Sequence, residues 1–390
     1  MSEMIRFSLP DGWVWSVLGE CCEVTMGQSP KSSTYNTRQD GLPFFQGKAE
    51  FGEMSPVAKK WCNAPQRIAQ KADVLISVRA PVGPVNIADT ECCVGRGLGV
   101  LRPNSKALIT MWLFWYMRSA EEKISNMGTG TTFGGISGDI LRKFPIPLPP
   151  MNKQKEIVAR IEFLLGRLDN AAAATEKAKK NLQQCKNSKL RSFFNGEAMT
   201  PISDICQTSS GGTPARANPA YYGGDIPWVK CKDLIDGVIT KTEEQITAEG
   251  LANSNTKILP KGTLLIALYA GSTIGRLGIL DMEACTNQAI CALTASEKVD
   301  TKYLFWYLMS IRDDLQSQAV GGVQLNINQS VLRQTKVWLP SPETQKEIVA
   351  RIESLFGGLD AVETTIATQK QKIKKCKNST LAVFMSGEKK

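Results

Sequence analysis

The nine residues QKEIVARIE stand at Gln154–Glu162 and return unchanged at Gln345–Glu353, 191 residues further along a chain of 390. The match extends without a gap from 154–197 onto 345–388, where 22 of 44 positions are identical. A long self-match at one fixed offset indicates a duplicated unit. The sequence therefore predicts a chain that is built twice on one plan.

Apolar residues in both copies follow a spacing of four, three, four, three, which is typical of a coiled coil. Prolines stand just before each copy, and Gly196 and Gly387 are predicted to end the helices. A helix of this length spans about 65 Å. We expect the two helices to pair within one chain; a plain dimerisation helix is the alternative. The predicted seam contains Ile157, Ile161, Leu164, Leu168, Ala171, Thr175, Ala178, Leu182 and Cys185 in the first copy. In the second copy it contains Ile348, Ile352, Leu355, Leu359, Val362, Ile366, Gln369, Ile373 and Cys376.

The composition favours a cytoplasmic protein without a membrane segment. The chain has no long apolar run, and its first residues do not resemble a secretory leader. Eleven cysteines without a C-x-x-C pair, and no histidine at all, argue for reduced thiols and against a zinc site. We expect cysteine to serve here as a small residue of the core.

The net charge of +10 is unevenly placed. Residues 151–197 carry ten Lys/Arg against five Asp/Glu, and residues 341–390 carry nine against six. Such basic segments are able to lie over a polyanion. The solvated face of a coiled coil is the alternative reading of the same charges.

The remaining sequence forms two globular segments that share an α/β plan. We predict domains at 1–150 and 198–340, separated and followed by spacer helices at 151–197 and 341–390. The first segment contains a predicted buried strand (73–78), an amphipathic helix (107–127) and a strand-like run (144–148). The second segment repeats these features with different residues, including a strand at 262–266 and the aromatic helix around Phe305. The aromatic clusters of both helices are expected to be core.

No constellation of catalytic residues is found. The absence of histidine excludes histidine-based acid–base chemistry, and no P-loop motif for a nucleotide occurs. Asn218-Pro219-Ala220-Tyr221 lacks the second proline of the adenine methyltransferase loop, so a simple turn is favoured. The chain is therefore predicted to bind rather than to catalyse.

These motifs together resemble the specificity subunit of type I restriction–modification systems over essentially the whole chain. The resemblance rests on Pro10-Asp11-Gly12-Trp13, on G-x-[ST]-P at Gly27–Pro30 and Gly211–Pro214, and on the stretch Pro147–Ile161 with Asn195-Gly196-Glu197. The helical stretch returns at 339–352 with Ser386-Gly387-Glu388, and it is the specific part of the pattern. The second segment departs from the family in having Thr200-Pro201-Ile202 where P-x-G-W is expected.

The resemblance implies two target-recognition domains, each of which reads one half of a split sequence in double-stranded DNA. It also implies an antiparallel pair of helices that sets the gap and docks two methyltransferase subunits. S-adenosylmethionine, ATP and Mg²⁺ would belong to the methyltransferase and restriction (translocase) subunits, and no cofactor or metal is expected in this chain. The two domains would meet one face of B-DNA about one helical turn, or 34 Å, apart.

Polar loop residues are the candidates for DNA contact, because lysine and arginine bind phosphates while polar side chains read base edges. A solvated polar surface is the alternative for any one of them. The candidates are Gln28, Ser29, Lys31, Ser33, Tyr35, Asn36, Arg38, Gln46, Lys48, Arg79, Arg96, Thr213, Arg216, Asn218, Tyr222, Lys230, Lys232, Tyr269, Ser272, Thr273 and Arg276. The rival hypotheses are a non-catalytic scaffold with duplicated protein-binding domains, and an enzyme with an unrecognised active site.

Overall fold

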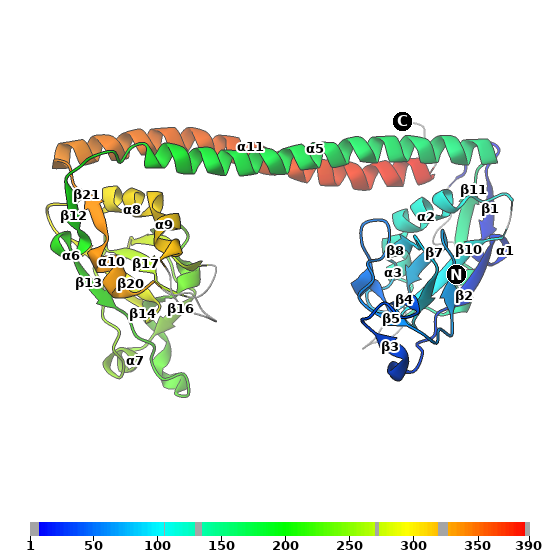
Figure 1. Ribbon diagram of the computed structural model, residues 1–390, viewed down its shortest axis with the longest axis horizontal. Coiled ribbons are helices and arrows are strands. Elements are labelled where there is room, and N and C mark those ends of the chain that lie inside the picture. Colours follow the sequence, from blue (N-terminus) through cyan, green and yellow to red (C-terminus); the bar gives the residue numbers. More distant parts are fainter. Residues whose placement is uncertain (1–7, 105, 129–134, 270–272, 319–326, 387–390) are drawn as a thin grey trace. The chain divides into compact units, whose positions relative to one another are not determined.

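A computed structural model describes residues 8–104, 106–128, 135–269, 273–318 and 327–386 (Figure 1). The chain divides into two compact units. The first unit consists of residues 1–175 and 368–390, and the second consists of residues 176–367. Each unit thus contains one α/β globular part and one half of each long helix. No helix among the described residues is long and apolar enough to cross a membrane.

Both repeated stretches form long helices, α5 (Met151–Arg191) and α11 (Pro342–Ser386) (Figure 1). The end of α5 differs from the prediction, because the helix stops at Arg191, before Gly196. Gly196 serves another purpose: a Cβ atom there would lie 1.9 Å from the indole of Trp338. The glycine is therefore required by close packing rather than by the helix end. Gly387 lies outside the described residues.

In the first unit the two helices run antiparallel. The Arg160 guanidinium lies 5.6 Å from the centre of the Phe384 ring, and Lys377 pairs with Asp169. As the residue number rises along α5, that of its partner in α11 falls, which is the antiparallel arrangement that the family resemblance implied.

In the second unit the same contacts recur with the helices exchanged. The Arg351 guanidinium lies 5.4 Å from the centre of the Phe193 ring. Lys186 donates to Asp360 and Glu363, at 2.7 Å each. Burial alone would lower the pKa of Lys186, but the hydrogen bonds to the two carboxylates outweigh it and raise the pKa. Apart from Glu363, whose counterpart is Ala172, the residues that make these contacts are identical in the two copies of the repeat.

Most of the predicted seam from Ile157 to Leu182 and from Ile348 to Ile373 is buried or half-buried. The prediction is wrong for four positions within these ranges, Ala171, Ala178, Val362 and Gln369, which are exposed. The continuation to Cys185 and Cys376 is wrong, because both are exposed. Seven residues of a straight α-helix fall about 20° short of two full turns, so a strict heptad position rotates away from the partner helix by about 80° over four heptads. Neighbouring residues are about 100° apart, and the next residue along the chain therefore takes the inward position. Lys186, only 8% exposed, faces inward in place of Cys185.

The first residue of the repeated nonapeptide fastens each helix to its globular part. Gln154 is fully buried; its Oε1 accepts from the N–H of Ile109 at 3.0 Å. Its Nε2 donates to the carbonyls of Ala107 at 2.6 Å and Pro149 at 2.9 Å. Gln345, also fully buried, makes the same three bonds, to Asp300 N at 2.8 Å, Lys298 O at 3.0 Å and Pro340 O at 2.9 Å. The start of each helix is thereby held in a fixed direction.

The globular part of the first unit is built on two sheets, one antiparallel and one mixed. A four-stranded antiparallel sheet has the order β2-β10-β7-β8, with β2 (Cys22–Met26), β10 (Leu98–Pro103), β7 (Val74–Ser77) and β8 (Val85–Ile87). The second sheet has the order β3-β5-β4-β9-β6, with β3 (Tyr35–Asn36), β5 (Trp61–Cys62), β4 (Leu42–Phe45), β9 (Cys92–Val94) and β6 (Ile68–Ala69). The pair β1 (Val14–Val17) and β11 (Pro145–Leu148) leads into α5. Short helices complete this part: α1 (Leu18–Cys21), η1 (Ser32–Thr34), η2 (Lys48–Glu50) and α4 (Gly138–Arg142).

The second unit repeats this plan. Its larger sheet has the order β13-β20-β17-β18-β15, with β13 (Cys206–Ser210), β20 (Ile290–Ala295), β17 (Leu264–Ala267), β18 (Leu277–Leu280) and β15 (Gly237–Ile239). The smaller sheet contains β16 (Glu244–Ile246), β14 (Tyr222–Val229) and β19 (Cys285–Thr286). The pair β12 (Met199–Pro201) and β21 (Lys336–Trp338) corresponds to β1 and β11, so Thr200-Pro201 occupies a strand despite its departure from the family motif. The short helices are α6 (Ile202–Ile205), η3 (Pro219–Tyr221), η4 (Cys231–Asp233), α7 (Ala248–Ala252) and α10 (Gln329–Gln334).

The aromatic helices form the cores. The single helix predicted over 107–127 is in fact divided into α2 (Thr110–Ser119) and α3 (Glu121–Ser125), because Ala120 leaves helical geometry with ψ near 5°. Phe114, Trp115 and Tyr116 are buried, as predicted. In the second unit α8 (Thr301–Ser310) and α9 (Arg312–Ser317) repeat the break. All cysteines except Cys185 and Cys376 are buried, which fits their predicted place in the core.

Candidate nucleic-acid interface

The G-x-[ST]-P motifs hold corresponding turns in the two globular parts. A Cβ atom on Gly27 would lie 2.2 Å from the carbonyl oxygen of Gly95, and one on Gly211 would lie 2.1 Å from that of Thr286. Only glycine permits this approach. The motif thus brings the following Ser or Thr against the loop that enters β10 or β20.

Backbone hydrogen bonds show which positions of the two parts correspond. Val78 N donates to Gly97 O at 2.9 Å, as Leu268 N does to Ala289 O at 2.8 Å. The bond from Gln28 N to Val94 O in the first part corresponds to that from Gly212 N to Thr286 O in the second. The bond from Gly95 N to Phe45 O likewise corresponds to that from Asn287 N to Val229 O. These bonds align four pairs of positions: 29 with 213, 46 with 230, 79 with 269, and 96 with 288.

We call Ser29, Gln46, Arg79 and Arg96 the first edge. The backbone N–H of Arg96 donates to Ser29 Oγ at 3.2 Å, and Ser77 Oγ donates to the carbonyl of Arg79 at 3.1 Å. The side chains of Gln46, Arg79 and Arg96 are exposed. Anchored backbones with exposed side chains are suited to reach a ligand.

A cavity of about 680 Å³ lies along this edge. It is lined by Gln46, Lys48, Arg79 and Arg96, four of the residues predicted from the sequence. Glu50 also lines it, but its carboxylate accepts from the backbone N–H groups of Gln46 and Gly47, at 3.2 and 3.0 Å. Within the described part of the chain, none of the three cations pairs with a carboxylate. The cavity therefore presents positive charge.

The second edge consists of Thr213, Lys230, Tyr269 and Gln288. The Thr213 hydroxyl donates to Oε1 of Gln288, and both side chains are exposed. Sequence reasoning missed Gln288. Its equivalence to Arg96 follows from the backbone bonds above and from the register of the strands, in which Ile290 pairs with Ala267 as Leu98 pairs with Ser77.

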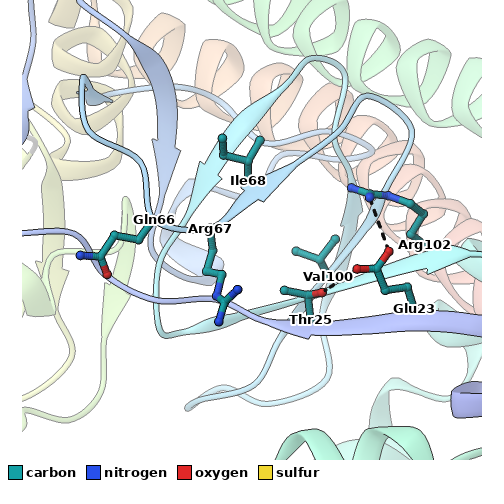
Figure 2. A pocket seen from close by; sticks show the side chains of 7 residues that line it. All are labelled: Glu23, Thr25, Gln66, Arg67, Ile68, Val100 and Arg102. Carbon is teal, nitrogen blue, oxygen red and sulfur yellow. Dashed lines mark hydrogen bonds and ion pairs between the residues drawn. The ribbon is translucent and has the colours of Figure 1, made fainter.

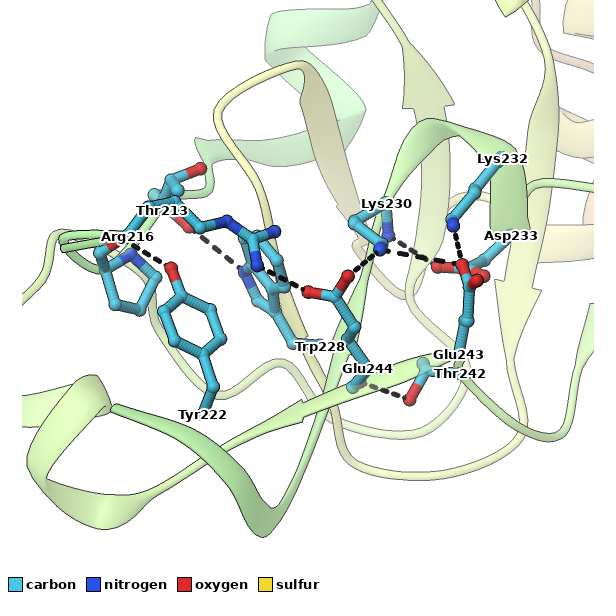
Figure 3. A network of polar contacts seen from close by, with 12 residues as sticks. Thr213, Arg216, Tyr222, Trp228, Lys230, Lys232, Asp233, Thr242, Glu243 and Glu244 are labelled. Carbon is cyan, nitrogen blue, oxygen red and sulfur yellow. Dashed lines mark hydrogen bonds and ion pairs between the residues drawn. The ribbon is translucent and has the colours of Figure 1, made fainter. Parts of the chain in front are cut away.

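Around the second edge the cations are already paired (Figure 3). Lys230 bonds Glu244 and lies 3.6 Å from Glu243, which also pairs with Lys232. Arg216 bonds Glu244 at 2.9 Å. The hydrogen bond from Lys230 lowers the pKa of Glu244, and the bond from Arg216 adds to this against the opposing effect of burial. These carboxylates offset the positive charge that the sequence predicted for DNA.

Aromatic rings hold Arg216 in place. Its guanidinium lies 4.4 Å from the ring centre of Tyr222 and 5.0 Å from that of Trp228. The Tyr222 hydroxyl donates to Pro214 O at 2.5 Å, and in the first unit Tyr35 donates to Pro30 O at 2.8 Å. Both tyrosines thus brace the loop of the G-x-[ST]-P motif.

The other predicted residues lie around these edges or serve the loops. Asn36 accepts from the backbone of Arg38 at 3.0 Å and of Asp40 at 3.1 Å, and Asn218 caps η3, which confirms a turn there. Exposed positions are held by Gln28, Lys31, Ser33 and Arg38, and half-buried ones by Thr273 and Arg276. Ser272 lies outside the described residues.

A second cavity in the first unit, of about 280 Å³, has a different character (Figure 2). Arg102, on its wall, bonds both carboxylate oxygens of the buried Asp73, at 2.8 and 2.6 Å. Glu23 lies 3.6 Å from the same guanidinium, and exposed Arg67 lines the opposite side. The charges of Arg102 are thus used inside the fold. The described residues bring no group of Cys, Asp or Glu together as a metal site.

Comparisons with known proteins identify the family. The family model described as "Type I restriction modification DNA specificity domain" matches residues 10–184 and 197–375. A putative MjaX specificity subunit from Methanocaldococcus jannaschii is 36% identical over 191 residues, which covers 48% of this chain and less than half (44%) of the relative. The EcoKI specificity subunit of Escherichia coli is 22% identical over 97% of this chain and 90% of the relative.

A solved chain from work on "complex assembly and conformational transition of the type I R-M system" shares the fold. Its TM-score is 0.80 at 20% identity, covering 98% of this chain and 100% of that one. The fold, the duplication and the family match agree. The chain belongs to the family of type I restriction–modification DNA specificity subunits and carries two copies of its domain.

Proposed function

We propose that this chain gives a type I restriction–modification complex its sequence specificity, each globular part reading one half of a bipartite duplex target. The observation that carries the proposal is the pair of edges. One backbone framework places different side chains at four equivalent positions, as two readers of different half-sequences require. Family membership supports DNA as the ligand.

The charge around the edges supports a division between affinity and specificity. Lys48 and Arg79 offer cations for phosphates, whose neutralisation gives salt-dependent affinity without sequence information. Side chains that reach base edges in the major groove then supply discrimination.

The helices α5 and α11 set the distance between half-sites and dock two methyltransferase subunits in this proposal. Gln154 and Gln345 support the first role, because three hydrogen bonds fix each helix to its globular part. Chemistry is assigned to the partners: the methyltransferases bind S-adenosylmethionine, and the restriction subunit uses ATP and Mg²⁺.

Methylation mapping of a host genome tests the proposal. The chain is expressed with its methyltransferase subunits, and a two-part adenine-methylation motif with a fixed gap is expected. Replacement of residues 1–150 by the domain of another family member should change only one half of the motif. A change in both halves, or in neither, would refute the assignment of one half-site to each domain.

Insertion of one heptad into each helix tests the spacer role. Placed in 171–182 and at the facing part of α11, the insertion adds about 10 Å and should lengthen the gap by about three base pairs. Both half-sequences should stay unchanged. Salt titration of duplex binding by the assembled complex separates the scaffold alternative, which predicts no affinity for any duplex even at low salt.

A further inference from the structure

Arg96 and Gln288 occupy equivalent places in the two edges. Each stands two residues before the first residue of its strand, β10 or β20. Each is hydrogen-bonded to the Ser or Thr of the G-x-[ST]-P motif: the N–H of Arg96 donates to Ser29 Oγ, and the side chain of Gln288 accepts from Thr213. Both side chains are exposed.

The hydrogen-bonding capacities of the two side chains differ. A guanidinium has only donors, five in a planar fork. A glutamine amide has two N–H donors and an oxygen that accepts twice. Since Thr213 uses one acceptor site of Gln288, one site on Oε1 and both hydrogens on Nε2 are left for a ligand.

These capacities match different bases in the major groove. Guanine presents two acceptors, O6 and N7, which suit the fork of an arginine. Adenine presents the N7 acceptor beside the N6 donor, which suits the amide of a glutamine. The fixed Thr213 hydroxyl holds the amide oxygen on one side, so the amide presents one orientation rather than two.

The surroundings reinforce the difference. Arg96 shares its cavity with Arg79 and Lys48, a setting that suits the negative edge of guanine. Near Gln288 the cation Lys230 is bonded to Glu244, so this edge is close to neutral. A neutral reader in a neutral setting favours the mixed donor–acceptor pattern of adenine.

We propose that Arg96 reads a guanine in one half-site and that Gln288 reads an adenine in the other. The inference rests on the proposed function and adds the base class and the residue for each half. Ser29 and Thr213 act as positioning residues. Ser29 holds the backbone from which Arg96 projects, and Thr213 holds the side-chain amide itself.

Selection from a randomised duplex library, with the complex of the full chain and its methyltransferase subunits, tests this. Wild type should select a two-part motif with a G·C pair in one half and an A·T pair in the other. Arg96→Gln should weaken the preference at that G·C pair by about 5- to 150-fold and leave the second half intact. Gln288→Arg should do the same at the A·T pair and leave the first half intact.

Arg67→Gln is the matched control, because Arg67 is an exposed arginine of the same unit that lines the other cavity. It should leave the motif unchanged. If Arg96→Gln weakens binding equally for all sequences, Arg96 contacts phosphate and the inference fails. It also fails if neither variant alters the motif or if Arg67→Gln alters it as strongly. Failure of the wild type to select any two-part motif would instead refute the proposed function itself.

Discussion

Replacement of Gln154 by leucine tests how firmly α5 is joined to the first globular part. Leucine branches one carbon earlier than glutamine, at Cγ rather than Cδ, and the substitution removes three hydrogen bonds, one from Ile109 N–H and two to the carbonyls of Ala107 and Pro149. Each buried group left without a partner costs about 1–3 kcal/mol. Pro149 is buried and Ile109 is half-buried, whereas Ala107 is exposed and water is able to replace its lost bond. Two groups therefore lose their partner, and we expect a loss of about 3 kcal/mol in the free energy of unfolding.

Urea denaturation of the full chain measures this loss, and hydrogen exchange of the α2 amides localises it to the first unit. Gln183→Leu is the control on the same helix, because Gln183 is exposed and its side-chain amide donates to Asn187, one turn further along the helix, at 3.0 Å. Its effect should stay within about 0.5 kcal/mol. Gln345→Leu should reproduce the large loss in the second unit. A loss for Gln154→Leu no greater than that of the control would refute the reasoning.

Three further predictions concern an ion pair, two glycines and an acidic side chain. Lys186→Met should change the free energy of unfolding by less than about 1 kcal/mol, because an apolar side chain replaces the buried ammonium and leaves only carboxylates that reach solvent. The double variant Asp360→Ala/Glu363→Ala should cost more, because it leaves the buried Lys186 without either carboxylate. Urea denaturation compares the two, and equal losses would contradict this. Gly196→Ala should destabilise the fold by about 1–3 kcal/mol, because the new Cβ clashes with the indole of Trp338. Gly166→Ala should instead stabilise it by about 0.5–1 kcal/mol, because Gly166 lies inside α5 with open space around it and alanine favours the helix. Thermal unfolding measures both, and a loss of stability for Gly166→Ala as large as that for Gly196→Ala would contradict the prediction. The pKa of Glu244 is lowered, so its ion pairs stabilise the fold at neutral pH, and this stabilisation is lost as the pH falls through the folded-state pKa, below the ordinary value of about 4.3. Glu244→Gln should therefore reduce the loss of unfolding free energy at acid pH. An unchanged dependence on pH would count against the ion pairs of Glu244 with Lys230 and Arg216.

Repetition and periodicity predicted the large features of this fold. A nine-residue identity located both long helices, and the apolar run at 73–78 located β7 because a continuous apolar stretch of this length is typical of a buried strand. The polar loops around Gln46 and Arg79 were also predicted, and the structure brings them to one cavity. Local patterns of this kind depend on neighbouring residues only.

Features that depend on distant partners were beyond such patterns. The exposure of Cys185 follows from the slow drift of the helix against a strict heptad. The neutralisation of Lys230 depends on Glu244, which only the pairing of β14 with β16 brings near. Gln288 was missed because its equivalence to Arg96 follows from backbone pairing around β10 and β20, and an arginine and a glutamine give no similarity in sequence.

The placement of Phe384 and Met385 has a consequence for synthesis on the ribosome. Met385 is 2% exposed and belongs to the core that contains Trp112 of the first unit, whereas the core of the second unit draws its helix residues from positions no later than Phe356. The domain that leaves the ribosome first is thus completed last, when the final turns of α11 are released. A stop codon placed just before Leu381 should therefore destabilise the first unit more than the second.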